Sequence, residues 1–168
     1  RNGFRETLES GAVLFEKLKF FEERKIGDYL VTPLPGRHLG STENRSANYL
    51  FEDAEGKTLY YGTDTGYYFP ETIDFLKDHP VNTLITECTW DDNWPWNPEK
   101  DKHLSLGALK ELLKILTEKG ALGSFSKVYV THISHNHRRS HEELEDFMTG
   151  WTEFPFKIHI AYDGMEIN

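Results

Sequence analysis

Hydrophobic and polar positions along this chain follow patterns that predict a series of helices and strands. The most regular pattern predicts a helix that begins after Ser105 and ends at Gly120 or Gly123. Its leucines have the i, i+3, i+4, i+7 spacing of one helical face: Leu109, Leu112, Leu113 and Leu116. We therefore expect this face to be part of the core.

Three further helices are predicted from their boundary residues. Pro70 opens a helix over residues 70–80, since proline suits the first helical turn, and Pro80 stops it. Ser140 and Glu143 have the spacing of a capping box before a helix over residues 141–151. Residues 4–13 predict a short, weak helix that is interrupted by glycine.

Runs of β-branched and aromatic residues predict the strands. Residues 46–53 and 58–64 read as a hairpin, because the connection between them holds Gly56. Residues 15–23 and 29–35 are expected to be two strands around a turn at 24–28. Strands are also expected at 81–89, at 126–132 and, once or twice, within 156–168. Hairpins come first and strands alternate with helices afterwards, which predicts one α/β domain over residues 1–168 with a mixed sheet.

Composition narrows the classes of function. The chain has 168 residues and a formal net charge of −9, with 19 Lys and Arg against 28 Asp and Glu. Extended nucleic acid is therefore not an expected partner, and an anionic substrate would need a local positive centre such as a metal ion. Cys88 is the single cysteine, and no apolar run is long enough to span a bilayer. A cytoplasmic location is expected.

Side chains able to bind a metal follow the predicted strands. His38, Asp64, Glu87 and His132 each lie at or just beyond the end of a strand, and His103 lies in the loop before a helix. Imidazole and carboxylate ligands suit a divalent cation such as zinc or manganese. Each of these residues also has an ordinary interpretation as a polar residue of a loop or turn.

The order of the motifs is more specific than any one of them. The chain contains, in sequence, "VTPLPGRH", "LYYGTDTG", "LITECT", "KH" before a helix, "VTHISHNH" and "AYDGMEI". This set resembles the metallo-β-lactamase superfamily, in particular its phosphodiesterase branch related to the cyclic-phosphate hydrolases of phosphonate utilisation. The resemblance implies an αββα sandwich with mixed sheets, of which this chain is the C-terminal part, about two thirds of a complete domain.

The resemblance also implies roles for five residues. His38, Asp64 and His132 match metal ligands of the superfamily, with Asp64 bridging two divalent ions, zinc or manganese. His103 matches a loop histidine near the scissile phosphate, which suits a general acid for the leaving oxygen. His135 would be a neighbouring catalytic residue that supports the site or contacts the phosphate.

One motif of the superfamily is absent from this sequence. The signature H-x-H-x-D-H has no counterpart, since the single H-x-H, His135-Asn136-His137, is followed by two arginines and lies in the wrong half. His137 is therefore expected to be exposed to solvent. Two protein ligands per ion are fewer than zinc sites usually have. We expect the remaining ligands from a missing N-terminal segment that is cleaved, split off or not included in this sequence. The expected partner is this complementary segment or a second copy of the chain in a homo-oligomer, since apolar strand faces would otherwise be exposed.

The predicted function is hydrolysis of a small or cyclic phosphodiester through a hydroxide activated by two metal ions. The alternative is an inactive or non-enzymatic half-domain that retains the fold and a partial site. A tRNA-processing nuclease is disfavoured because no basic patch is visible, and an aspartic protease because Asp64-Thr65-Gly66 has no second copy. The loop from Trp90 to Trp96 would either stack on a base or sugar or cover an apolar edge.

Overall fold

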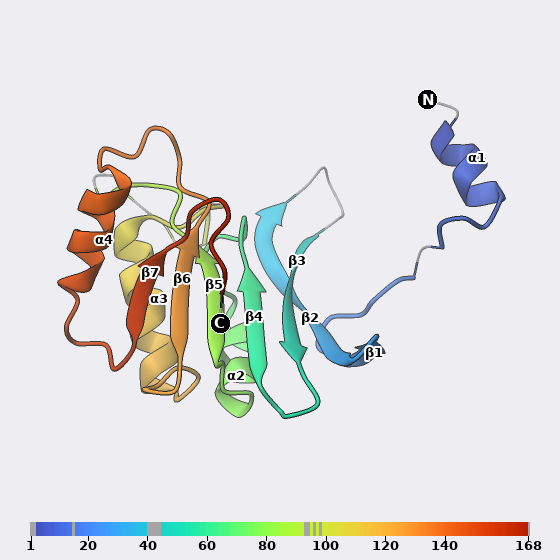
Figure 1. Cartoon of the computed structure of the whole chain (residues 1–168), viewed down its shortest axis with the longest axis horizontal. Helices are drawn as coiled ribbons and strands as arrows, with labels where there is room; N and C mark the ends of the chain where they lie inside the picture. The colour runs from blue at the N-terminus through green and yellow to red at the C-terminus, as the bar shows by residue number, and fades with distance from the viewer. Residues whose placement is uncertain are drawn as a thin grey trace.

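Seven strands form one mixed sheet in the computed structural model, which describes residues 3–14, 16–39, 45–92, 95, 97 and 99–167 (Figure 1). The strands lie side by side in chain order: β1 (Arg24–Ile26), β2 (Tyr29–Leu39), β3 (Arg45–Glu52), β4 (Thr58–Gly62), β5 (Thr83–Glu87), β6 (Lys127–Thr131) and β7 (Lys157–Ile160). Pairs from β1 to β4 are antiparallel, and pairs from β4 to β7 are parallel. The predicted hairpin of β3 and β4 is confirmed.

Four helices accompany the strands within the described residues: α1 (Gly3–Glu9), α2 (Pro70–Asp78), α3 (Leu106–Glu118) and α4 (His141–Thr149). Their starts follow from the sequence. The hydroxyl of Ser105 accepts a hydrogen bond from the backbone of Ala108 at the start of α3. Ser140 and Glu143 form the predicted capping box of α4.

The main core lies between the sheet and helices α2 and α3, which cover one of its faces (Figure 1). The leucine stripe of α3 is completely buried, as predicted. It belongs to the same buried cluster as Leu84 of β5 and Val128 and Val130 of β6. Leu84 lies opposite Val128 in the pairing of β5 with β6. A shift of one residue would turn these side chains away from α3, so their burial fixes the pairing of the strands and which strand ends lie together.

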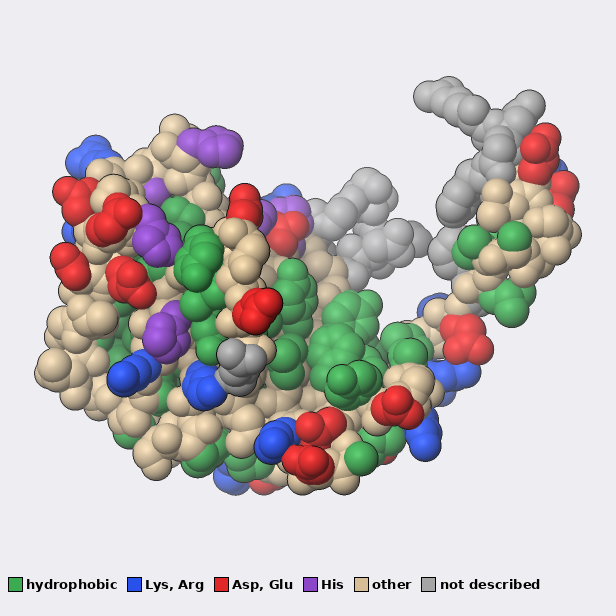
Figure 2. Space-filling view, viewed as in Figure 1, with side chains coloured by type: hydrophobic (Ala, Val, Ile, Leu, Met, Phe, Trp, Pro, Cys, Tyr) green, Lys and Arg blue, Asp and Glu red, His purple; other side chains and the backbone are tan. Residues whose placement is uncertain are grey.

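The opposite face of the sheet is apolar over β3, β4 and β5, and no helix of the described residues lies over it. Tyr49 pairs with Tyr61, and Tyr61 pairs with Ile85, so these side chains share the face that points away from α2 and α3. Tyr61 is 45% exposed. Figure 2 shows hydrophobic side chains gathered over the strands of this face. We call it the open face.

The α/β class and the mixed sheet are confirmed, while the second sheet of a sandwich is not among the described residues. The strand expected at 15–23 is wrong, because β1 lies within the predicted turn and no strand is assigned to the described part of 15–23. Phe21 packs its ring 5.7 Å from that of Phe75 in α2 instead of pairing in the sheet. No helix of the described chain is long and apolar enough to cross a membrane.

Candidate metal centre

The topology brings the ends of four strands to one edge of the sheet. β2 and β4 are both antiparallel to β3, so β2, β4, β5 and β6 all end at the same edge. His38 lies at the end of β2, Asp64 just after β4, Glu87 at the end of β5 and His132 directly after β6. The loop before α3 brings His103 to the same place. Residues distant in sequence thus meet at one point.

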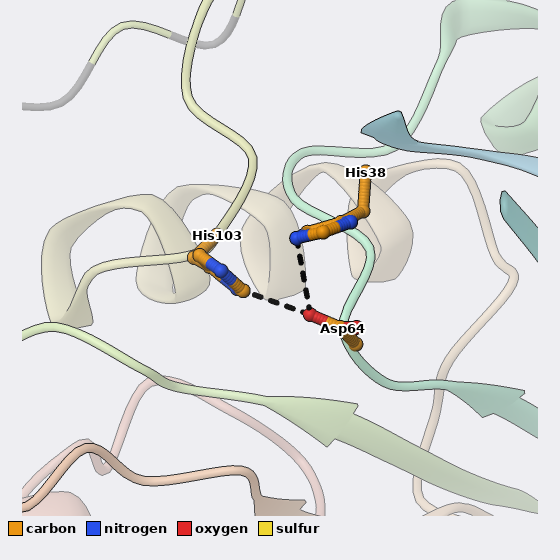
Figure 3. Close-up of side chains that lie close together, drawn as sticks. All are labelled: His38, Asp64 and His103. Atoms are coloured by element: carbon orange, nitrogen blue, oxygen red, sulfur yellow. Dashed lines mark ion pairs between the residues drawn. The ribbon is translucent and has the colours of Figure 1, made fainter. Parts of the chain in front are cut away.

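Three imidazoles converge on one oxygen of Asp64. Its Oδ1 lies 3.5 Å from His38 Nε2, 3.5 Å from His103 Nδ1 and 3.4 Å from His132 Nε2. Figure 3 shows the side chains of His38 and His103 directed at Asp64. The Asp64 side chain is 51% exposed, so the cluster is open to ligands from solvent.

Two residues of the cluster have an unusual backbone conformation. Asp64 has φ 52° and His132 has φ 54°, in the left-handed region that disfavours residues other than glycine. Such a conformation costs on the order of 1 kcal/mol or more and persists only where surrounding contacts fix it. We call residues 63–69 the Asp64 loop and residues 132–140 the His132 loop.

The Asp64 loop is held by Glu87, whose side chain is completely buried. Glu87 Oε1 accepts hydrogen bonds from the backbone N–H groups of Thr65, at 2.6 Å, and Gly66, at 2.8 Å. The same loop lies close to the segment before α3, since a Cβ on Gly66 would come within 2.7 Å of the carbonyl oxygen of Asp101. The buried carboxylate therefore fixes the backbone that presents Asp64.

The second oxygen of Glu87 connects the remaining parts of the site. Oε2 accepts from the Thr89 hydroxyl at 2.5 Å and from the Leu104 backbone at 3.2 Å, and it lies 3.1 Å from His103 Nδ1. With Nδ1–H donated to Glu87, the other nitrogen of His103 is the one available for chemistry. Thr89 Oγ1 also lies 3.0 Å from the carbonyl oxygen of His132.

The His132 loop is bonded to residues 89–92, of which Thr89 and Asp91 are buried. The backbone of Ser134 donates to the carbonyl of Thr89, and the carboxylate of Asp91 accepts from the backbone of Arg138. Arg139 forms ion pairs with Asp91 and with Asp92. Burial alone would raise the pKa of Asp91. Hydrogen bonds with the side chain and backbone of Asp92 and with the backbone of Arg138, together with the charge of Arg139, lower it to about 2.

The donor set of the cluster fits a divalent ion. The spacings of 3.4 to 3.5 Å exceed those of ordinary hydrogen bonds, which are about 2.7–3.2 Å. Two atoms that each lie about 2.1 Å from a tetrahedral ion are separated by about 3.4 Å. Two groups of possible ligands occur in the described chain: His38, Asp64, His103, and Glu87, His103, His132. Since the oxygens of Glu87 are already occupied by donors, Asp64 is the better carboxylate ligand.

Comparisons with known proteins identify the family. The model of the beta-lactamase superfamily domain matches residues 2–133, which include all five residues of this edge. The chain belongs to this superfamily. No curated protein sequence matches it.

Solved structures of metallo-β-lactamase fold proteins are similar to this chain. Yeast PDE1 is 20% identical with TM-score 0.67, and the match covers 89% of this chain and 48% of that one. A diphosphatase from the PhnP family is 20% identical with TM-score 0.62, and the match covers 97% of this chain and 52% of that one. The metallo-β-lactamase fold protein YhfI from Bacillus subtilis is 14% identical with TM-score 0.63, and the match covers 98% of this chain and 61% of that one. These matches show the fold, and the chain spans about half to three fifths of their length.

The structure brings together four of the five predicted site residues of this superfamily member: His38, Asp64, His103 and His132. His135 lies exposed in the turn after β6 and belongs to neither group of ligands within the described residues. The prediction for His137 is wrong. Both of its ring nitrogens are buried without a hydrogen-bond partner, and burial lowers its pKa.

The sequence did not predict the roles of Glu87 and Thr89 in the site. The sequence left open whether Glu87 faces solvent or supports a ligand, and the structure places it at the centre of the network. A carboxylate at the end of an otherwise apolar strand is the signal that points to such a role. Thr89 gave no signal of its own. Trp94 and Trp96 lie outside the described residues, while the Trp90 ring packs edge-on against His103 at 6.1 Å.

Proposed function

We propose that this chain is part of a metal-dependent phosphodiesterase that hydrolyses a small or cyclic phosphodiester. The observation that carries the proposal is the convergence of three imidazoles on the exposed Asp64 carboxylate. Membership of the superfamily supports it, and so do the names of its structural neighbours, a PDE1 and a diphosphatase. The net charge of −9 disfavours an extended nucleic acid as substrate.

In this proposal His38, Asp64 and His132 would hold the divalent ions, zinc or manganese. Such ions lower the pKa of a water molecule and stabilise the charge that develops on phosphate. The side chains of the chain itself provide the orientation, because the left-handed backbone at Asp64 and His132 directs both toward one point. The ions would be held where a phosphate can approach from solvent.

His103 would donate the proton to the leaving oxygen. Its Nδ1 lies 3.1 Å from Glu87 and 3.5 Å from Asp64, which leaves Nε2 as the nitrogen that would give the proton. His135 would contact the substrate phosphate from the His132 loop, where it is exposed. These roles assign His103 to chemistry and His135 to binding.

The partner in this proposal is a complementary N-terminal segment that supplies further ligands and covers the open face, or a homo-oligomer that covers it. The sheet face that carries Tyr49, Tyr61 and Ile85 has no helix over it within the described part of the chain. A cavity of about 650 Å³ opens beside Tyr129 and His159. Exposed apolar patches rimmed by polar residues are typical of interaction sites. We expect a cytoplasmic location, because the single cysteine is buried and has no disulfide partner.

A second candidate is a non-enzymatic half-domain that retains the fold and a partial site. The observation that favours it is the number of ligands. With His103 kept for proton transfer, His38, Asp64 and His132 are the ligands that the described cluster offers, and two ions need about three protein ligands each. In this case the chain would serve in association and bind metal weakly or not at all.

Metal content separates the two candidates. The purified protein is analysed for zinc and manganese together with its intact mass, and then assayed with bis(p-nitrophenyl) phosphate and cyclic nucleotides. About two ions per chain with hydrolysis that Asp64→Asn abolishes would support the phosphodiesterase. Metal-free protein that gains no activity with zinc or manganese, alone or with an N-terminal partner, would reject it.

A further inference from the structure

Pairing between β2 and β3 is interrupted where β2 reaches the site. The register is regular up to Pro35 and shifts before Leu39, so the segment that carries His38 leaves the ladder. There the backbone N–H of Arg37 donates to the carbonyl oxygen of Thr65 at 2.7 Å. At residue 37, β2 is thus bonded to the Asp64 loop in place of β3, before Leu39 pairs with Arg45 again.

The side chain of Arg37 adds two contacts to the same loop. Its Nε donates to the carbonyl oxygen of Tyr67 at 2.7 Å. Its guanidinium carbon lies 4.1 Å from the centroid of the Phe69 ring, a cation–π distance. Arg37 therefore contacts residues 65, 67 and 69, along most of the Asp64 loop.

We infer that Arg37 is a positioning residue of the metal centre, which sets the spacing between Asp64 and His38. The inference rests on the proposed function, since it assigns Arg37 a purpose in metal binding. Glu87 holds the loop from the side of β5, through the N–H groups of Thr65 and Gly66. Arg37 holds it from the side of β2, next to His38. Two opposed anchors keep the left-handed conformation of Asp64, which a single anchor would leave free to relax.

The geometry requires arginine in particular. The planar guanidinium donates from Nε in its own plane while its flat face covers the Phe69 ring. Lysine keeps the charge but has neither the Nε–H nor the flat face. The backbone bond from residue 37 to Thr65 remains in such a variant, so Arg37→Lys removes the side-chain contacts alone.

Cobalt(II) binding to the whole chain tests the inference, because cobalt absorption bands report the geometry of the ligands. We expect Arg37→Lys to weaken cobalt binding about tenfold and to shift the bands, with an unchanged unfolding midpoint. Arg24→Lys is the matched control. Arg24 lies in β1 and pairs with Glu16 at 2.6 Å, remote from the cluster in sequence and on an exposed strand. It should behave as the unmodified protein.

Two results would overturn the inference. One is cobalt affinity and bands in Arg37→Lys equal to those of the unmodified chain. The other is weaker cobalt binding in Arg37→Lys that is fully explained by a smaller folded fraction, while the folded protein keeps the absorption bands of the unmodified chain.

Hydrogen exchange without metal separates this inference from the proposed function. If the unmodified chain binds no cobalt, the proposed metal centre fails, and exchange at the amides of Thr65 and Gly66 decides the role of Arg37. Exchange about tenfold faster in Arg37→Lys than in the unmodified chain would support positioning of the loop. Equal exchange rates would reject it.

Discussion

The Asp64 loop and the His132 loop present their ligands in the same way but are held differently. Each contains a residue in the left-handed region, Asp64 with φ 52° and His132 with φ 54°, and the two side chains lie 3.4 Å apart. The Asp64 loop is anchored on a fully buried carboxylate, through hydrogen bonds of 2.6 and 2.8 Å. The His132 loop is anchored by longer backbone bonds of 3.2 Å, from Ser134 to Thr89 and from Arg138 to the buried Asp91 carboxylate. Arg139 adds ion pairs with Asp91 and with Asp92, which is 43% exposed.

The difference indicates that the Asp64 loop is more rigidly held than the His132 loop before a metal binds. A buried hydrogen-bonded carboxylate cannot lose its donors without a large desolvation cost. Surface ion pairs contribute only about 0–1 kcal/mol and weaken with salt. We therefore expect Asp64 to keep its place without metal, and His132 to adjust its place when metal binds.

The largest effect is expected from Glu87→Ala. Removal of the carboxylate leaves the N–H groups of Thr65 and Gly66 buried without partners, so the free energy of unfolding should fall by about 3 kcal/mol or more. Glu87→Gln keeps an acceptor and should lose less. Urea unfolding of both variants measures this. A loss below about 1 kcal/mol in Glu87→Ala would show that the buried anchor does not hold the loop.

Gly66→Ala should have the next largest effect. Gly66 has φ 68°, and an added Cβ would lie 2.7 Å from the carbonyl oxygen of Asp101 and 3.0 Å from that of Lys102. Gly120→Ala is the matched control, with φ 81° and open space around the added atom. The control should lose about 1 kcal/mol from backbone strain alone, and Gly66→Ala at least about 1 kcal/mol more. Equal losses would mean that the contact with the segment before α3 is not tight.

Acid should weaken the His132 loop through Asp91. The pKa of Asp91 in the folded chain, about 2, is lower than the ordinary value of 3.8. Its contribution is therefore present above about pH 4 and is lost as the pH falls toward 2, about 1–2 kcal/mol in total. Urea unfolding at pH 5 and at pH 2.5 should show a smaller decrease in Asp91→Asn than in the unmodified chain. Asp163→Asn, which changes an exposed carboxylate, is the control.

The smallest effect on stability is expected from Asp64→Asn. The side chain is 51% exposed and its imidazole neighbours are 3.4 to 3.5 Å away, so the free energy of unfolding should change by no more than about 0.5 kcal/mol. Thermal unfolding at pH 7 measures it. A large loss would show that Asp64 has a structural role as important as that of Glu87.

Elements defined by local pattern were predictable from the sequence. The leucine stripe of α3, the capping box at Ser140 and the hairpin with Gly56 depend on residues a few positions apart, and all three are confirmed. The strand expected at 15–23 is wrong because the aromatic pattern there serves packing of Phe21 on α2.

The sequence predicted the residues that meet at the site, but not the hydrogen bonds that hold them there. Strand ends and motif order predicted His38, Asp64, His103 and His132, since topology alone brings such ends together. The roles of Glu87 and Thr89 depend on hydrogen bonds that join residues of four loops, and no local pattern encodes them. The burial of His137 is likewise a tertiary effect.

X-ray absorption of the zinc-loaded protein tests the central claim most directly. We predict a first shell of nitrogen and oxygen at about 2.0–2.1 Å, with outer-shell scattering from at least two imidazoles. Asp64→Asn, which should remain folded, should lose this signal. A zinc signal without imidazole scattering, or one that is equal in Asp64→Asn, would contradict a metal centre built on Asp64.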